Sequence, residues 1–121
     1  MIESKIKLTL WAGEKFFGPG ICELLEGIRD TGSIQAAAAR MEMSYTKAWR
    51  ILNRAEAAMG VRLIARMSGG KKGGSSTLTG AGETAVHDFR AMEAKLNAMA
   101  GELLRACERS FAPNQEGSDA L

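Results

Sequence analysis

Residues 31–79 decide the fold of this chain, and they read TGSIQAAAARMEMSYTKAWRILNRAEAAMGVRLIARMSGGKKGGSSTLT. Two stretches with helical spacing, each preceded by a serine, are followed by a glycine-rich basic segment. Between residues 40 and 72 there are eight basic and two acidic residues, a local charge of +6, whereas the remainder of the chain carries −4. A positive segment this concentrated is the electrostatic pattern expected of a nucleic-acid binder.

The two serines predict where two helices begin. Ser33 can cap a short helix over 34–40, whose alanines are small enough to let another helix approach closely. Residues 41–43 make a turn, Ser44 caps a longer helix over 45–59, and Gly60 ends that helix. This spacing is that of a helix-turn-helix.

The helix over 45–59 separates into two faces when its residues are placed at about 100° intervals. The apolar face gathers Ala48, Ile51, Leu52, Ala55 and Met59. The polar face gathers Thr46, Lys47, Arg50, Asn53 and Arg54. No acidic residue of this helix precedes Glu56, although a solvated face normally mixes charges of both signs. The polar face is therefore better explained by an external polyanion, and Trp49, between the faces, is predicted to pack.

The segment after Gly60 predicts a β-hairpin with a basic tip. Residues 61–66 have the character of a strand, 68–74 are a glycine-rich loop with two lysines, and 75–79 form the returning strand. A nucleotide-binding loop would need a lysine followed by Ser or Thr, and Lys72 is followed by glycine. The hairpin instead predicts a wing that reaches a phosphate backbone or a minor groove.

The flanking segments predict one strand and two helices. Alternating charged and apolar residues over 4–11 have the period of a short strand, and residues 19–31 have helical spacing up to Gly32. A last helix is expected over about 80–110. Its apolar residues follow a heptad pattern: Phe89, Met92, Leu96, Met99 and Leu103. Such a seam predicts a two-fold dimer, and it explains the methionines better than a ligand site does.

Composition limits the remaining possibilities. A chain of 121 residues with 45% hydrophobic residues accommodates one domain, expected over 1–110, and the polar composition of 111–121 predicts a disordered tail. The first ten residues lack the apolar run of a signal peptide or membrane helix, which indicates a cytoplasmic protein. Cys22 and Cys107 lack the spacing of metal ligands and are expected to be free thiols; no metal or cofactor is predicted. The histidine, His87, lies near Asp88 and Glu83 on a helix surface, and no nucleophile is paired with a base, so catalysis is not expected.

Several of these segments resemble a known family. The segments 32–34, 36–39, 44–49, 69–74 and 78–79 look like the N-terminal winged-helix domain of the molybdate-responsive ModE regulators, and the resemblance extends over residues 4–108. LysR-type regulators share the alanine-rich second helix and the pattern of Gly60–Leu63. The resemblance implies a homodimer that binds operator DNA, with the first and last helices at the dimer interface. Full-length ModE regulators continue into molybdate-binding modules for which this chain has no room. We therefore expect either a single-domain regulator, controlled by abundance or by a separate ligand-binding partner protein, or a fragment.

The sequence thus predicts a mostly α-helical fold with a small β-hairpin, namely a winged helix-turn-helix with a long C-terminal dimerisation helix. Arg50 is expected to take a guanine edge, beside major-groove contacts from Tyr45, Thr46 and Lys47. Backbone amides beside Ser33 and Ser44 are expected to meet phosphates. The cations expected to neutralise phosphates are Arg54, Arg66, Lys71 and Lys72. The residues expected at the dimer interface are Ile21, Leu24, Leu25, Phe89, Met92, Leu96, Met99 and Leu103.

These features predict a homodimeric regulator of transcription that reads double-stranded DNA, with a link to molybdenum metabolism suggested by the resemblance. Two alternatives remain open at this point. The same fold can bind an acidic protein partner through its basic helix. It can also sense a small oxyanion at the helix N-termini near Ser33 or Ser44.

Overall fold

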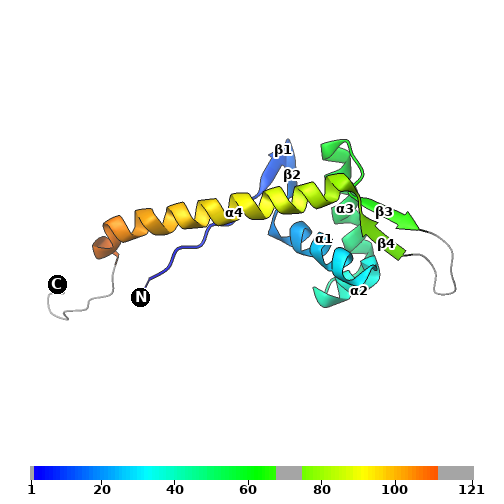
Figure 1. The fold of residues 1–121 in the computed structure, drawn as a ribbon, viewed down its shortest axis with the longest axis horizontal. Coiled ribbons are helices and arrows are strands. Elements are labelled where there is room, and N and C mark those ends of the chain that lie inside the picture. Colours follow the sequence, from blue (N-terminus) through cyan, green and yellow to red (C-terminus); the bar gives the residue numbers. More distant parts are fainter. Residues whose placement is uncertain (1, 68–74, 112–121) are drawn as a thin grey trace. The chain divides into compact units, whose positions relative to one another are not determined.

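The computed structural model describes residues 2–67 and 75–111 (Figure 1). Along the chain these form β1 (Leu10–Ala12), β2 (Glu14–Phe17), α1 (Pro19–Thr31), α2 (Ile34–Arg40), α3 (Tyr45–Met59), β3 (Ile64–Met67), β4 (Ser75–Leu78), α4 (Gly80–Cys107) and the 3₁₀ turn η1 (Glu108–Ser110). The predicted fold class is confirmed: the chain is mostly α-helical, with a hairpin after the helix-turn-helix and a long final helix.

The chain divides into two compact units. One comprises Lys7–Arg90, and the other combines the residues up to Ile6 with those from Ala91 onward. The predicted hairpin tip, with Lys71 and Lys72, and the predicted tail beyond Phe111 lie outside the described residues. Within the described ranges, no helix is both long and apolar enough to cross a membrane.

The helix ends lie where the capping residues placed them. The Ser33 hydroxyl accepts a hydrogen bond from the Ala36 amide, and the Ser44 hydroxyl accepts one from the Lys47 amide, both at 3.0 Å. Gly32 ends α1 and Gly60 ends α3, each in the left-handed region that glycine adopts without strain, with φ of 75° and 72°.

The predicted strand over residues 4–11 is wrong in its bounds, because only Leu10 and Trp11 of that range lie in a strand. Residues 4–9 are not in a strand; β1 begins at Leu10, and Gly13, with φ of 82°, turns the chain into β2. The alternating pattern had the right period, but a strand needs a neighbour with which to pair. The amide of Ile6 instead donates to the side-chain oxygen of Asn97 at 2.9 Å.

The core of the unit Lys7–Arg90 forms where α1 packs against α2, α3 and the wing. Its largest fully buried side chains include Leu24, Leu25 and Ile28 of α1, together with Leu52, Leu63, Ile64 and Phe89. The ring of Phe89 also packs on Phe17, with centroids 5.2 Å apart. Burying each such side chain contributes about 1.5–3 kcal/mol. Residues of α1 are thus the centre of the fold.

This core corrects half of the predicted dimer interface. Ile21, Leu24, Leu25 and Phe89 are at most 4% exposed within a single chain, so they have no surface to offer a partner. Helical spacing is the same for an internal core and for a dimer seam, which is why the pattern did not separate them. The remaining seam residues are exposed, by 36% to 64%: Met92, Leu96, Met99 and Leu103.

The wing is attached to the helices at both ends of its strands. β3 and β4 pair antiparallel, and the Ser76 amide donates to the Gly32 carbonyl at 2.9 Å. β3 begins at Ile64, later than predicted, and the Glu56 carboxylate accepts the amides of Leu63 and Ile64 at 2.7 and 3.2 Å. Glu56 therefore fixes the turn between α3 and the wing.

Candidate nucleic-acid interface

The polar face of α3 is a row of exposed cations. Lys47, Arg50 and Arg54 are exposed, whereas Ala48 and Leu52 on the opposite side are buried. No acidic side chain in the part of the chain that the structure describes forms an ion pair with any of these three cations. The face therefore presents uncompensated positive charge to solvent.

An aromatic stack holds the wing arginine beside this face. The guanidinium carbon of Arg66, on β3, lies 5.2 Å from the centre of the Trp49 ring. The Trp49 ring meets Tyr45 edge to face, with centroids 6.3 Å apart. Sequence reasoning predicted Trp49 to pack but did not find its contact with Arg66. The four-residue spacing of Tyr45 and Trp49 indicates that these two rings are neighbours on a helix, but it carries no signal for the contact with Arg66, which lies on a different element.

The N-termini of α2 and α3 have a positive electrostatic potential that no nearby acidic residue of the same helix reduces. Neither helix has an acidic residue in its first turn, and each is capped by a serine hydroxyl. Free amides and the helix dipole at such an end attract negative groups. Ser44, Tyr45 and Thr46 are exposed, whereas Ser33 is half-buried and its amide donates to the Thr31 hydroxyl at 3.2 Å.

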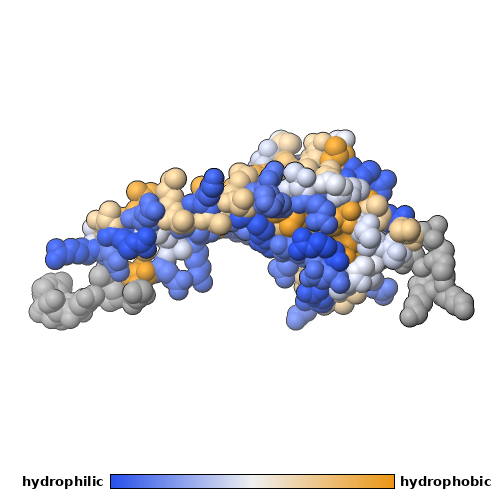
Figure 2. All heavy atoms as spheres, viewed as in Figure 1, coloured by the Kyte–Doolittle hydropathy of each residue, from blue (hydrophilic) through white to orange (hydrophobic). Residues whose placement is uncertain are grey.

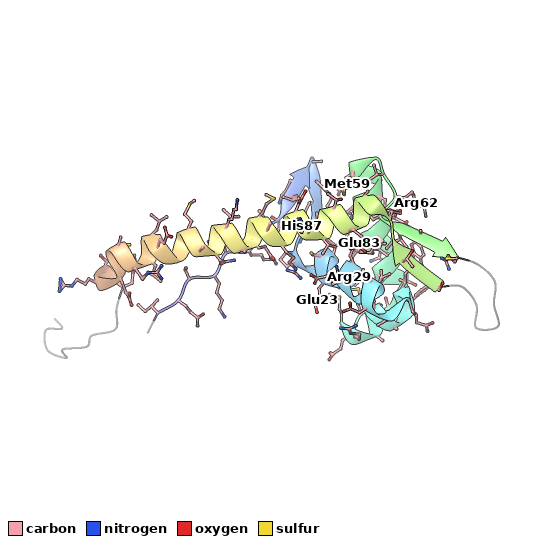
Figure 3. The ribbon with its side chains drawn as sticks, in the orientation of Figure 1. Glu23, Arg29, Met59, Arg62, Glu83 and His87 are labelled. Carbon is pink, nitrogen blue, oxygen red and sulfur yellow. The ribbon has the colours of Figure 1, made fainter. Side chains whose placement is uncertain are left out.

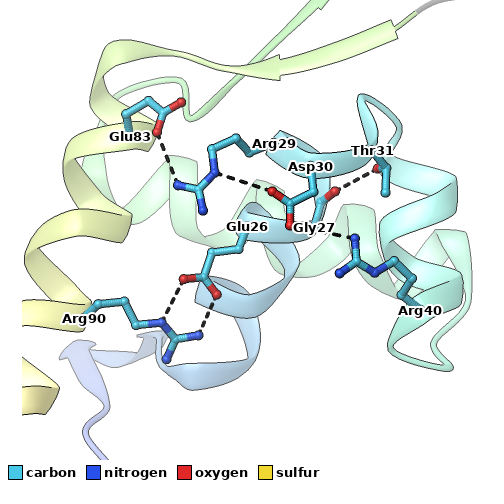
Figure 4. A network of polar contacts seen from close by, with 8 residues as sticks. All are labelled: Glu26, Gly27, Arg29, Asp30, Thr31, Arg40, Glu83 and Arg90. Atoms are coloured by element: carbon cyan, nitrogen blue, oxygen red, sulfur yellow. Dashed lines mark hydrogen bonds and ion pairs between the residues drawn. The ribbon is translucent and has the colours of Figure 1, made fainter.

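Of the described basic residues in the positive segment, two form ion pairs with acidic side chains. Arg62, which is labelled in Figure 3, lies 3.4 Å from the Glu56 carboxylate. Arg40 lies 4.0 Å from Asp30 (Figure 4). The charge count along the sequence therefore overstates the positive charge available to a ligand. The candidate interface is therefore smaller than the positive segment 40–72, and it centres on α3 and Arg66.

A separate ionic network ties α1 to α4 within the unit Lys7–Arg90 (Figure 4). Arg90 donates two hydrogen bonds to Glu26, from Nε at 3.0 Å and from Nη2 at 2.7 Å, and Arg29 lies 3.6 Å from Glu83. The hydrogen bonds from Arg90 lower the pKa of Glu26 below its ordinary value, while partial burial opposes that shift. This network is structural, because its charges compensate one another.

Titratable groups elsewhere show no arrangement for metal binding. Among residues 2–67 and 75–111, no cluster of three or more His, Cys, Asp or Glu side chains is placed to hold a metal ion. His87 is exposed, and its Nδ1 lies 3.1 Å from the carboxylate of the neighbouring Asp88. Cys22 is buried and Cys107 is exposed, and neither forms a disulfide.

The apolar seam continues on the part of α4 that begins at Ala91. Met92, Leu96, Met99 and Leu103 are exposed there, and Figure 2 shows hydrophobic and hydrophilic side chains interspersed on the surface of the C-terminal part of this helix. Large apolar side chains in a regular row mark an interaction surface more often than a solvated one.

The comparison with known proteins identifies the helix-turn-helix. Residues 22–83 match the sequence pattern of the bacterial regulatory helix-turn-helix proteins of the lysR family. The chain belongs to this family. The matched lysR segment runs from α1 to the start of α4 and contains all the candidate DNA-binding residues, whereas the exposed apolar seam lies outside it.

The resemblance to ModE is also confirmed. "Molybdenum transport protein ModE" of Herbaspirillum seropedicae is 31% identical over 95% of this chain and 46% of its own length. "Transcriptional regulator ModE" of Yersinia pestis is 35% identical over 70% of this chain and 33% of its own length. The chain thus spans less than half the length of these curated relatives.

Two solved structures share the fold. The crystal structure of the CbnR DNA-binding domain in complex with DNA has a TM-score of 0.55 and 27% identity, over 74% of this chain and 95% of that chain. Full-length CbnR complexed with its target DNA has a TM-score of 0.54 and 28% identity, over 72% of this chain and 28% of that chain. Both neighbours were solved with DNA.

Proposed function

We propose that this chain binds double-stranded DNA through α3 and the wing, and that it regulates transcription as a homodimer. One observation carries the proposal: Lys47, Arg50 and Arg54 form an exposed face, without ionic partners among residues 2–67 and 75–111, on the second helix of a lysR-type helix-turn-helix. Unpaired cations on a helix that can enter a major groove are the requirement for groove reading and phosphate contact.

The individual roles follow from position and chemistry. Arg50 presents a planar fork that matches the two acceptors of a guanine edge, and Tyr45, Thr46 and Lys47 flank it near the start of α3. Arg66, held by Trp49, and Arg54 neutralise phosphates, and the amides at the starts of α2 and α3 contact phosphate oxygens. Lys71 and Lys72 extend the same role to the wing tip.

The dimer forms through the exposed seam of α4 in this proposal. Met92, Leu96, Met99 and Leu103 supply an apolar surface that a second copy covers by two-fold symmetry. Two copies then present two α3 helices to two half-sites, one or more helical turns of about 34 to 36 Å apart.

The similarity to ModE proteins extends the proposal to cellular context. We assign the chain to the regulation of genes for molybdenum metabolism, acting in the cytoplasm without catalytic activity. The molybdate signal, where one acts, would come from a segment or partner protein outside the sequence described here.

The test is a titration with fluorescent duplex DNA at two salt concentrations. The wild-type chain should bind, and binding should weaken as salt rises, because counterions are released from the phosphates. A variant with Lys47→Gln and Arg54→Gln should bind more weakly with a smaller salt dependence. The absence of DNA binding by the wild type at low salt, together with binding of an acidic polypeptide, would replace this proposal with a protein-interaction module.

A further inference from the structure

A hollow of about 280 Å³ lies at the start of α1, within the unit Lys7–Arg90. Its uncharged lining comes from Phe16 and Phe17 of β2, from residues 18–21 and from Ile51 of α3. Sites for drug-sized ligands occupy about 300–1,000 Å³, so this hollow suits a small ion or a single protruding group.

All the charged side chains that line the hollow are cationic. They come from three parts of the chain: Lys7, Lys15 on β2 and Arg54 on α3. All three are exposed, and none of them forms an ion pair with an acidic side chain in the described ranges. Three like charges around one hollow repel each other, and an anion placed between them is attracted by every one.

The backbone strengthens this attraction. Gly18 precedes α1 without a side-chain cap, and no acidic residue lies in the first turn of this helix. Pro19 has no amide hydrogen, so Gly20 and Ile21 supply the first amides of the helix. The helix therefore starts with amides that no side chain caps, on residues that line the same hollow as the three cations.

The hollow and the wing flank opposite edges of the polar face of α3. At about 100° per residue, Ile51 lies beside Arg54 at one edge of this face. Trp49, whose ring contacts Arg66, lies at the other edge. A helix in a major groove has a phosphate backbone on each side of it. The wing and the hollow therefore lie on opposite sides of the α3 face that the proposed function assigns to the groove.

We propose that this hollow binds a phosphate-class oxyanion, and that in the DNA complex the oxyanion is a backbone phosphate on the side of α3 opposite the wing. The identity of the occupant rests on the proposed DNA binding, because free phosphate or sulfate would be recognised by the same groups. Lys7 and Lys15, which sequence reasoning left out of the DNA-binding set, are then phosphate-positioning residues that carry no sequence information.

The test removes two of the cations and compares a matched control. The hollow variant carries Lys7→Gln with Lys15→Gln, and the control carries Lys5→Gln with Lys95→Gln, which removes the same charge from exposed positions outside the hollow. Circular dichroism establishes that both variants fold. The slope of the logarithm of affinity against the logarithm of salt should fall by about two in the hollow variant, about one for each of the two hollows of the dimer, on specific and random duplexes alike. The control should keep the wild-type slope, and an equal fall in the control would overturn the proposal.

Phosphate-ethylation interference gives a second reading on the same proteins. Ethylation of one phosphate position in each half-site should block DNA binding by the wild type and by the control. Ethylation at the same position should have no effect on DNA binding by the hollow variant. Retention of the complete wild-type interference pattern by the hollow variant would overturn the assignment to a backbone phosphate.

Inorganic phosphate distinguishes the two sources of the oxyanion. In the DNA-free protein, the amide resonances of Gly20 and Ile21 should shift as phosphate is added, and they should not shift in the hollow variant. A phosphate response with an unchanged DNA slope would overturn the DNA source and identify a site for a free anion. The absence of both effects would overturn the site altogether. If the wild type does not bind DNA, the proposed function fails. The phosphate titration then tests by itself whether the hollow is an oxyanion site.

Discussion

The guanidinium of Arg66 rests on an aromatic ring. Its carbon lies 5.2 Å from the centre of Trp49, and no acid in the described residues pairs with it. A cation on an aromatic face keeps its charge available for a phosphate, whereas an ion pair would neutralise it. Trp49 thereby positions a cation of the wing beside the first turns of α3.

We expect Trp49→Leu to weaken DNA binding about two- to fivefold on specific and random duplexes alike, because an exposed cation–π contact contributes about 0.5–1 kcal/mol. Affinity measurements on Trp49→Leu, Arg66→Ala and the double variant form a cycle. The double variant should bind no more weakly than Arg66→Ala alone. Fully additive losses would show that Trp49 and Arg66 act independently.

The role of Arg50 is tested by discrimination between DNA sequences. Arg50→Ala should cost about 1 to 3 kcal/mol on the preferred site and relax the preference at one base position, because a bidentate contact with guanine is lost. Arg54→Ala, one helical turn later, is the control and should weaken all sequences equally. Equal losses on specific and random DNA for Arg50→Ala would contradict a base-reading role.

At the scale of elements, the helices could be predicted from their capping residues. The first pair of strands could not be predicted, because strand pairing depends on a neighbouring segment. Ser33, Ser44, Gly32 and Gly60 act within a few residues of themselves, so local sequence was sufficient to place α1, α2 and α3. The hairpin of β1 and β2 was missed because the alternating residues before it have the period of a strand without a partner to pair with. In the candidate site, the polar face of α3 could be predicted from the helical periodicity of the sequence. The stack of Arg66 on Trp49 and the hollow at α1 could not, because they depend on contacts between distant segments.

The start of α4 depends on a close approach to the wing. A Cβ atom at Gly82 would collide with the carbonyl oxygen of Leu63, whereas nothing lies within 4 Å of a Cβ atom at Gly80. Urea denaturation should show that Gly82→Ala destabilises the fold by about 1–3 kcal/mol. Gly80→Ala, two residues earlier, should leave stability within about 0.5 kcal/mol of wild type. Similar stability of both variants would mean that the contact between α4 and the wing is loose.

The hydrogen bonds between Arg90 and Glu26 make the join of α1 and α4 sensitive to acid. Arg90 holds the pKa of Glu26 below its ordinary value of 4.5, so the pair stabilises the fold above that pH, and this stabilisation is lost as pH falls through the lowered pKa. Because both side chains are partly exposed, Glu26→Gln should destabilise the fold by about 1 kcal/mol or less at neutral pH.

The same measurement in acid separates this pair from general charge effects. Below about pH 4.5 the difference between Glu26→Gln and wild type should shrink, because wild-type Glu26 becomes protonated as well. Glu23→Gln, an exposed acid of α1 without an ion pair among the described residues, is the matched control and should change stability little at either pH. A constant deficit of Glu26→Gln across the pH range would contradict the ionic explanation.

At the scale of the whole molecule, the exposed seam of α4 carries the proposed dimer. Leu96→Glu with Met99→Glu should raise the dimer dissociation constant about 30-fold or more, because central apolar contacts of an interface contribute about 2 kcal/mol or more. Ala94→Glu with Ala98→Glu introduces the same charges at exposed positions away from the seam and should leave the dimer intact. Sedimentation velocity distinguishes these outcomes, and a monomeric wild type would remove the seam from the proposal.

The most direct test of DNA reading by α3 is the selection of bound genomic fragments, titrated against random duplex at two salt concentrations. The proposed function predicts enrichment of one site with two symmetric half-sites, bound by the wild type and lost with Arg50→Ala. Salt-sensitive binding without any preferred site, unchanged by Arg50→Ala, would contradict sequence reading by α3.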